Sequence, residues 1–147
     1  MGFNTKAFRA QDQLVGALQN ITALTDWTID YGLPSRRQEL HIWVDENVEN
    51  WEQEAGTTGL VTRNENFRIS VYIYSRKRGA SAQEIRDEIA TAASTISDVV
   101  GSEPFLSGAV LYAQIVAADY GGAFADADGK IREGVLKLTI ECDAFIA

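Results

Sequence analysis

Histidine, cysteine and clustered carboxylates are the side chains through which this sequence could perform acid–base or nucleophilic chemistry. It contains one histidine, His41, and one cysteine, Cys142. His41 lies between Leu40 and Ile42 on the polar phase of an expected strand, where a structural surface histidine is predicted. One histidine favours neither a Ser–His–Asp nor a Cys–His arrangement. Cys142 falls on the apolar phase of the last expected strand, which predicts a buried, unreactive thiol.

A metal site is suggested only by Asp126-Ala-Asp128-Gly129, which resembles part of a calcium-binding loop. Aligning Gly129 with the glycine of that loop places Phe124 and Val135 at its first and twelfth positions. Both positions require an oxygen ligand, and the twelfth requires a bidentate Glu. The segment is therefore predicted to be a solvated turn between the last two strands. Phosphate-loop and dinucleotide fingerprints are also missing from the sequence, so no catalytic, cofactor or metal residue is predicted.

Two charge clusters carry the remaining polar signal. Arg76, Lys77 and Arg78 lie between the clearest strand and the clearest helix. They form either a solvated loop or a contact site for an acidic protein or a phosphate. Five acids within ten residues form either a solvated edge or a deliberately negative surface: Asp45, Glu46, Glu49, Glu52 and Glu54. Carboxylate pairs are expected by chance in so acidic a chain and specify no reaction. One basic and one acidic patch would suit head-to-tail association of identical copies, which closes into a ring when the rotation permits.

Aromatic side chains form a second candidate interface. Trp43, Tyr72 and Tyr74 lie on the phase of their strands opposite the aliphatic one. A second apolar face indicates cover by further helices or by another subunit. Because Tyr and Trp are favoured interface anchors, burial by a partner is one of the two readings.

Composition sets the protein class. The 147 residues carry 13 basic and 21 acidic side chains, for a net charge of −8. Ordinary hydrophobic content and the absence of an internal linker predict one domain over residues 1–147. The acidity disfavours dedicated nucleic-acid binding, although a surface that DNA passes without adhering remains open. Neither a signal peptide nor a run of 18 apolar residues is present, so no membrane association is expected.

Two helices are expected. Ser81-Ala-Gln-Glu84 reads as a capping box that starts a helix over residues 82–100, with Gly101 predicted to end it. Its apolar stripe follows helical spacing: Ile85, Ile89, Ala92, Ile96 and Val99. An earlier helix is expected over residues 6–20, capped by Asn4 or Thr5. Its looser apolar face contains Phe8, Leu14, Val15, Leu18 and Ile21.

Strands are indicated by alternation of apolar and polar residues. The clear cases are Phe67–Ile73, Leu40–Val44 and Leu136–Cys142, with another strand at about residues 109–118. Shorter candidates are Trp27–Tyr31 and residues 48–62, where Gly56-Thr-Thr-Gly59 could turn a hairpin. The order of a helix, about four strands, a helix and two strands predicts an α+β fold with a mostly antiparallel sheet and two main helices.

This layout resembles the tail-terminator (tail-completion) proteins of long-tailed bacteriophages. The resemblance spans nearly the whole chain, through Tyr31-Gly32-Leu33-Pro34, Glu65–Ile73, the capped helix from Ser81 and Leu106-Ser-Gly108 before the penultimate strand. It implies a structural virion protein without catalytic residues or cofactors, which forms a homo-oligomeric ring, usually of six copies. Such a ring caps the tail tube protein and offers a docking surface to the head connector or neck protein. DNA crosses its lumen without specific binding.

The resemblance carries over no functional residue by motif. We interpret the acids from Asp45 to Glu54 as possible lumen-facing residues, and Arg76–Arg78 as a subunit or tube contact. Assembly in the cytoplasm of a bacterial host and residence in the virion are implied. Three alternatives stay open: a head–tail neck protein of related fold, a small α+β enzyme acting through carboxylates, and a ligand-binding module.

Overall fold

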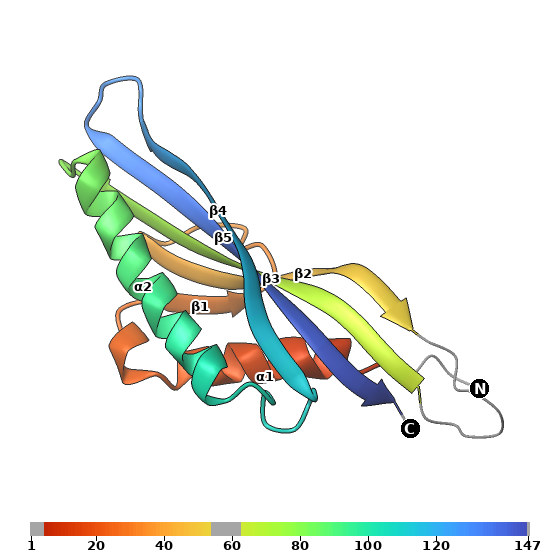
Figure 1. Ribbon diagram of the computed structural model, residues 1–147. Coiled ribbons are helices and arrows are strands. Elements are labelled where there is room, and N and C mark those ends of the chain that lie inside the picture. The colour runs from red at the N-terminus through yellow and green to blue at the C-terminus, as the bar shows by residue number, and fades with distance from the viewer. Residues whose placement is uncertain (1–4, 54–62, 147) are drawn as a thin grey trace.

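A long twisted sheet with two helices on one face forms the structure, a computed structural model that describes residues 5–53 and 63–146 (Figure 1). The fold is α+β, as the sequence predicts. Its elements in chain order are α1 (Ala7–Gln19), the 3-10 helix η1 (Thr22–Leu24), β1 (Thr28–Tyr31), β2 (Leu40–Gln53), β3 (Arg63–Arg78), α2 (Ala82–Ser102), β4 (Tyr112–Ala125) and β5 (Ile131–Ile146).

The five strands lie in the order β1-β2-β3-β5-β4. In the part of the chain that the structure describes, β1 and β2 pair in parallel, and the other three strand pairs are antiparallel. The ladder between β3 and β5 runs without interruption from Arg63 opposite Ile146 to Arg78 opposite Ile131. This ladder lies in the interior of the sheet, and β1 and β4 are the two edge strands.

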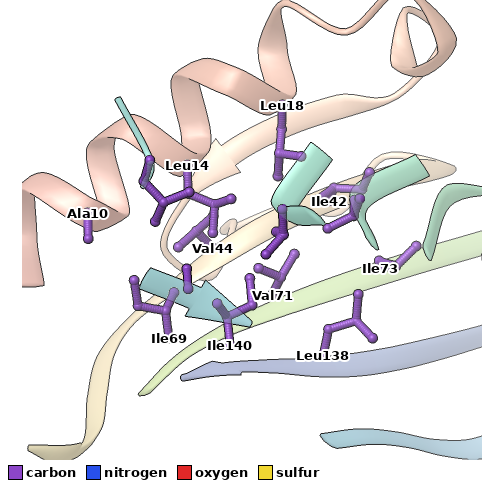
Figure 2. Close-up of a cluster of buried hydrophobic side chains, with 14 of the residues drawn as sticks. Ala10, Leu14, Leu18, Ile42, Val44, Ile69, Val71, Ile73, Leu138 and Ile140 are labelled. Atoms are coloured by element: carbon purple, nitrogen blue, oxygen red, sulfur yellow. The ribbon is translucent and has the colours of Figure 1, made fainter. Parts of the chain in front are cut away.

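Both helices cover the same face of the sheet. The helix α1 packs against β1 and β2, and α2 packs against β3, β4 and β5 (Figure 1). The core lies between these layers, where aliphatic side chains from the helices meet those of the strands (Figure 2). Its strand residues recur at every second position, because successive side chains of a strand point to opposite faces: Ile42, Val44, Ile69, Val71, Ile73, Leu138 and Ile140.

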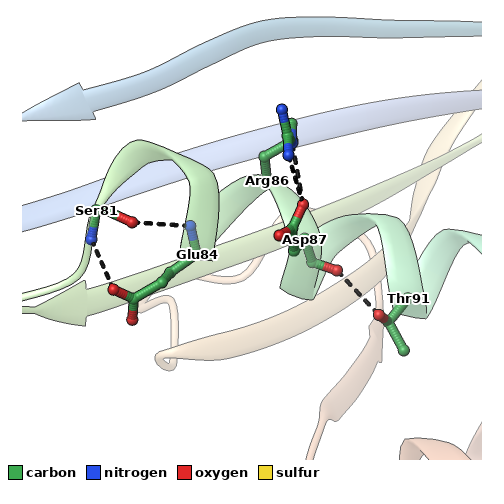
Figure 3. Close-up of polar contacts among 5 residues, drawn as sticks. All are labelled: Ser81, Glu84, Arg86, Asp87 and Thr91. Atoms are coloured by element: carbon green, nitrogen blue, oxygen red, sulfur yellow. Dashed lines mark hydrogen bonds and ion pairs between the residues drawn. The ribbon is translucent and has the colours of Figure 1, made fainter.

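The helix α2 begins as its sequence predicts. The Ser81 hydroxyl accepts the Glu84 N–H, and the Glu84 carboxylate accepts the Ser81 N–H, which completes the capping box (Figure 3). The predicted end at Gly101 is wrong, because the helix continues to Ser102 and its last buried apolar residue is Val100. The helix lies close to β5 at Gly134, where an added Cβ would sit 3.0 Å from Cγ2 of Ile85.

Asn4 or Thr5 was predicted to cap α1, but the N-cap residue is Lys6, whose side chain makes no capping hydrogen bond. Asn4 lies outside the described residues. The Thr5 hydroxyl instead accepts the Ala7 N–H at 3.0 Å. Phe8, expected on the apolar face, is half exposed, with its ring edge-on to Trp51. Leu14 and Leu18 are fully buried as predicted, and Val15 and Ile21 are partly buried against the core. The buried stripe also includes three residues that were not predicted: Ala7, Ala10 and Gln11.

The strands are longer than the alternation alone predicts. Residues 48–53 are not a separate strand but continue β2 past register shifts between Val44 and Val48 and between Glu49 and Glu52. The expected turn at residues 56–59 lies outside the described residues. The penultimate strand runs from Tyr112 to Ala125 rather than over about residues 109–118, and its pairing with β5 has a register shift between Ile115 and Ala117.

The turn predicted at residues 126–129 does connect β4 to β5. There Asp126 Oδ1 accepts the N–H groups of Lys130 and Ile131, and Gly129 adopts φ +68°. Neither described helix combines the length with the apolar composition that a membrane-spanning helix requires.

Candidate functional site

His41 is buried rather than on the surface, and its contacts are structural. Its Nε2 lies 2.6 Å from Oδ2 of Asp30 on β1, and its Nδ1 accepts the Gln38 N–H at 2.9 Å. An Nδ1 that accepts leaves the proton on Nε2, which donates to Asp30. The ring therefore fastens the loop between β1 and β2 to the sheet. The prediction that His41 lies on the surface is wrong, because the alternation of apolar and polar residues cannot show that a loop folds back over a strand.

Cys142 is buried, as predicted. It points from β5 into the core opposite Ala113 and Phe67. Burial, with smaller contributions from the neighbouring Asp143 and Glu141 carboxylates, raises the pKa of the thiol to about 12. A thiol in this state is a poor nucleophile, because the thiolate is the reactive form.

Glu65 is a buried carboxylate that the sequence pattern did not single out. Only 1% of it is exposed. Oε1 accepts the Lys6 N–H at 2.8 Å, and Oε2 accepts from the Thr5 hydroxyl at 2.7 Å and from Trp51 Nε1 and Gln53 Nε2 at 2.8 Å each. Burial alone would raise the pKa, but these hydrogen bonds lower it below its ordinary value. Glu65 thus ties the start of α1 to β2 and β3.

The sheet face opposite the helices, called the open face here, carries the three predicted aromatic residues. Trp43 and Tyr72 stack with ring centroids 5.2 Å apart and planes 12° apart. The guanidinium of Arg37, from the loop that His41 fastens, lies 5.2 Å from the Tyr74 ring centroid and 5.9 Å from that of Trp43. Trp43 and Tyr74 are each only 4% exposed. The chain itself therefore covers most of this cluster, and Tyr72 remains half buried.

The three basic residues Arg76, Lys77 and Arg78 end strand β3 and are not in a loop. Alternation along the strand separates them: Arg76 and Arg78 lie on the open face, and Lys77 lies on the other. Arg76 and Arg78 are joined by two arginines that the sequence analysis did not select. Together they line a depression of about 350 Å³, the arginine recess: Arg36, Arg37, Gln38, Glu39, Arg76, Arg78 and Ile131.

Hydrogen bonds hold the arginine recess in shape. The Arg76 N–H donates to the Glu39 carbonyl at 2.8 Å, and the loop is anchored further at Gln38 by His41. Among the described residues, none of its four guanidinium groups lies within ion-pair distance of a carboxylate. The recess thus concentrates positive charge, because its four guanidinium groups outnumber the single carboxylate of its lining, Glu39.

The four described acids of the predicted cluster do not form one surface. Asp45 and Glu46 lie in the first register shift of β2, where their carbonyl groups accept from Gln11 of α1. Glu49, on the open face, accepts from Lys137 at 3.1 Å and is already paired. Glu52 is exposed on the same face, and Glu54 lies outside the described residues.

Glu52 instead shares a row with a second acid, Asp143, at the end of the sheet remote from the arginine recess. Glu52, Asn66, Asp143 and Tyr112 are cross-strand partners on β2, β3, β5 and β4, so they form one row on the open face. Asn66 donates to Asp143 at 2.5 Å. We call this row the acidic row. Beside it lies a depression of about 450 Å³, whose lining includes the half-exposed Phe145 and Leu111.

Comparison with known proteins shows the fold alone. No protein-family model and no curated protein matches this sequence. Among solved structures, the chain superposes on a chain of the virion of a native gene transfer agent particle with a TM-score of 0.53. The match covers 91% of this chain and 94% of that chain, at 12% sequence identity. The described residues contain no group of three or more His, Cys, Asp or Glu placed to hold a metal ion.

Proposed function

We propose that this protein is a structural component of a phage-like virion, specifically the tail terminator. In this role identical copies form a ring, expected to be hexameric, that caps the tail tube and joins it to the head connector. The observation that carries the proposal is the shared fold with a chain of a gene transfer agent virion, because the match extends over 91% of this chain. The protein would be assembled in the cytoplasm of the bacterial host and remain in the virion.

The surfaces of the sheet support an assembly role. The strand β4 is a sheet edge of 14 residues with a single charged side chain, Asp119. A long edge strand with few charges can pair with the edges of other molecules and cause aggregation, so in native proteins it is usually covered or paired. Exposed apolar side chains accompany it, including Tyr112 and Phe124. Large exposed apolar residues of this kind suit contacts with neighbouring subunits or with the tube.

The charge of the protein supports passage of DNA without binding. A net charge of −8 gives the chain a repulsive field toward phosphates. We place the exposed Glu46 toward the lumen. Of the other acids in the sequence-predicted set, Asp45, Glu49 and Glu54 are further lumen candidates, whereas Glu52 is assigned to a subunit contact below. The charges that are already paired, such as Glu49 with Lys137, would contribute less to this field.

Electron microscopy with isolated tail tubes tests the proposal. Purified protein added to tubes that lack their terminator should appear as a ring at one end of each tube and should stop further polymerisation of tube protein. A head–tail neck protein would instead bind the connector and leave tube growth unchanged. Rings that bind neither tube nor connector, or a protein that remains monomeric with both, would contradict the proposal.

A further inference from the structure

The arginine recess and the acidic row are complementary in charge and lie at opposite ends of the same sheet face. Asn66, in the acidic row, and Arg76, in the recess, are 10 positions apart on β3. At about 3.3 Å per residue this separation is roughly 33 Å. Screening in physiological salt acts over about 8 Å, so the two charge groups cannot neutralise each other within one molecule.

The recess is built to receive carboxylates. Four guanidinium groups converge on it, and each can form two parallel hydrogen bonds to a carboxylate. Arg37 is held over the rings of Trp43 and Tyr74, and the Gln38 N–H is held by His41. Because the Arg37 side chain and the loop backbone are already held, less conformational entropy is lost when a partner binds.

The acidic row offers the matching groups. Glu52 and Asp143 are exposed and form no ion pair with a described residue. Phe145, which is 50% exposed, lies beside them and supplies apolar contact area. A surface of carboxylates with an adjacent aromatic ring fits a depression lined by arginines and Ile131.

We propose that the arginine recess of one copy binds Glu52 and Asp143 of the next copy, head to tail. This contact identifies the pair of surfaces that joins adjacent subunits of the ring. It rests on the proposed function for one point, namely that successive contacts close into a ring. Each copy uses both surfaces once, so the contact is heterologous and closes into a ring when the rotation permits. A nucleic-acid phosphate is the competing occupant of the recess, disfavoured by the net charge of −8.

Charge reversal at both surfaces tests the contact. The variants R76E/R78E and E52R/D143R each place like charges against each other, and each should weaken self-association at least about tenfold. An equimolar mixture should restore association. The first variant keeps its acidic row and replaces two of the four recess arginines by acids, whereas the second is basic at both surfaces. The two variants can therefore alternate around an even-numbered ring. Sedimentation velocity and native mass spectrometry measure the assemblies, at low and at high salt.

The matched control is R86E, a charge reversal on the exposed face of α2, where Arg86 contacts Asp87. It should associate as the wild type does. Circular dichroism and urea unfolding establish that all variants are folded, which is expected because the exchanged side chains are exposed.

Three outcomes would overturn the contact. The first is unchanged association of R76E/R78E. The second is a mixture that stays dissociated. The third is a loss of duplex DNA binding in R76E/R78E with unaltered self-association, which would assign the recess to phosphate. Rings that still cap tail tubes in R76E/R78E would refute this contact alone, whereas failure of the wild type to cap tubes would refute the proposed function.

Discussion

Nε2 of His41 lies 2.6 Å from Oδ2 of Asp30, so the only histidine of the chain is a fastening between two parallel strands. The other ring nitrogen accepts the Gln38 N–H and thereby holds the loop that carries Arg36 and Arg37. A residue type that most often suggests acid–base catalysis here determines the position of the arginine recess.

Replacing His41 by alanine should destabilise the protein by about 2–4 kcal/mol, because it removes a buried ring and leaves the Gln38 N–H without its acceptor. Urea unfolding measures the loss, and hydrogen exchange should show faster exchange of the Gln38 amide. Gln38→Ala is the control. The hydrogen bond uses the backbone N–H of this exposed residue, so stability should change by less than about 0.5 kcal/mol. Unaltered exchange at Gln38 in His41→Ala would contradict the fastening role.

Glu65→Gln should cost about 2–3 kcal/mol near neutral pH, since an amide cannot accept hydrogen bonds from all four donors that surround the carboxylate. The pKa of Glu65 is lower in the folded than in the unfolded chain. Its contribution is therefore fully present above the unfolded value of about 4.3 and is lost as the pH falls through the lower folded pKa.

The measurement is the free energy of unfolding of wild type and Glu65→Gln as a function of pH. The difference should be constant from neutral pH down to about pH 5 and should shrink below about pH 4. Glu141→Gln is the control, because Glu141 forms a surface ion pair with Arg68 that should contribute less than about 1 kcal/mol. A difference that grows toward acid pH would show that Glu65 is protonated in the folded protein.

Two tyrosines should respond in opposite directions to removal of the hydroxyl. The Tyr120 hydroxyl is buried and has no hydrogen-bond partner among the described residues, so Tyr120→Phe should be neutral or stabilise by up to about 1 kcal/mol. The Tyr74 hydroxyl donates to Glu133, and Tyr74→Phe should destabilise by about 1–2 kcal/mol. Thermal unfolding of the pair measures both, and a destabilised Tyr120→Phe would indicate a partner for that hydroxyl.

Cys142 should resist thiol reagents until the protein unfolds. Burial raises its pKa to about 12, so very little thiolate is present at pH 8, and the reagent cannot reach the core. Labelling by a chromogenic disulfide should therefore be complete only in urea. A Ser94→Cys variant, with its second thiol on the exposed face of α2, should react with one equivalent in the folded state. Rapid reaction of the folded wild type would show local opening of β5.

Local rules account for the parts of the fold that were correctly predicted. The capping box at Ser81 and Glu84 needs only a spacing of three residues, and the alternation through Phe67 and Ile73 needs only the two-residue period of a strand. The sequence predictions fail where a segment distant in the chain determines the local structure. The β2 register shift at residues 45–47 accommodates Gln11 of α1, and no local pattern in β2 indicates it.

The candidate surfaces divide in the same way. The sequence by itself determined that the chain is acidic, that its chemistry-bearing residues are few, and that Trp43, Tyr72 and Tyr74 share a strand phase. Only the tertiary structure decided which charges meet. The loop before β2 brings Arg36 and Arg37 to Arg76 and Arg78, and strand alternation places Lys77 on the other face. Strand pairing places Glu52 and Asp143, which are far apart along the chain, on either side of Asn66 in one row. The physical reason is that charge and strand phase are properties of single residues and their near neighbours, whereas a surface is made by the register between strands.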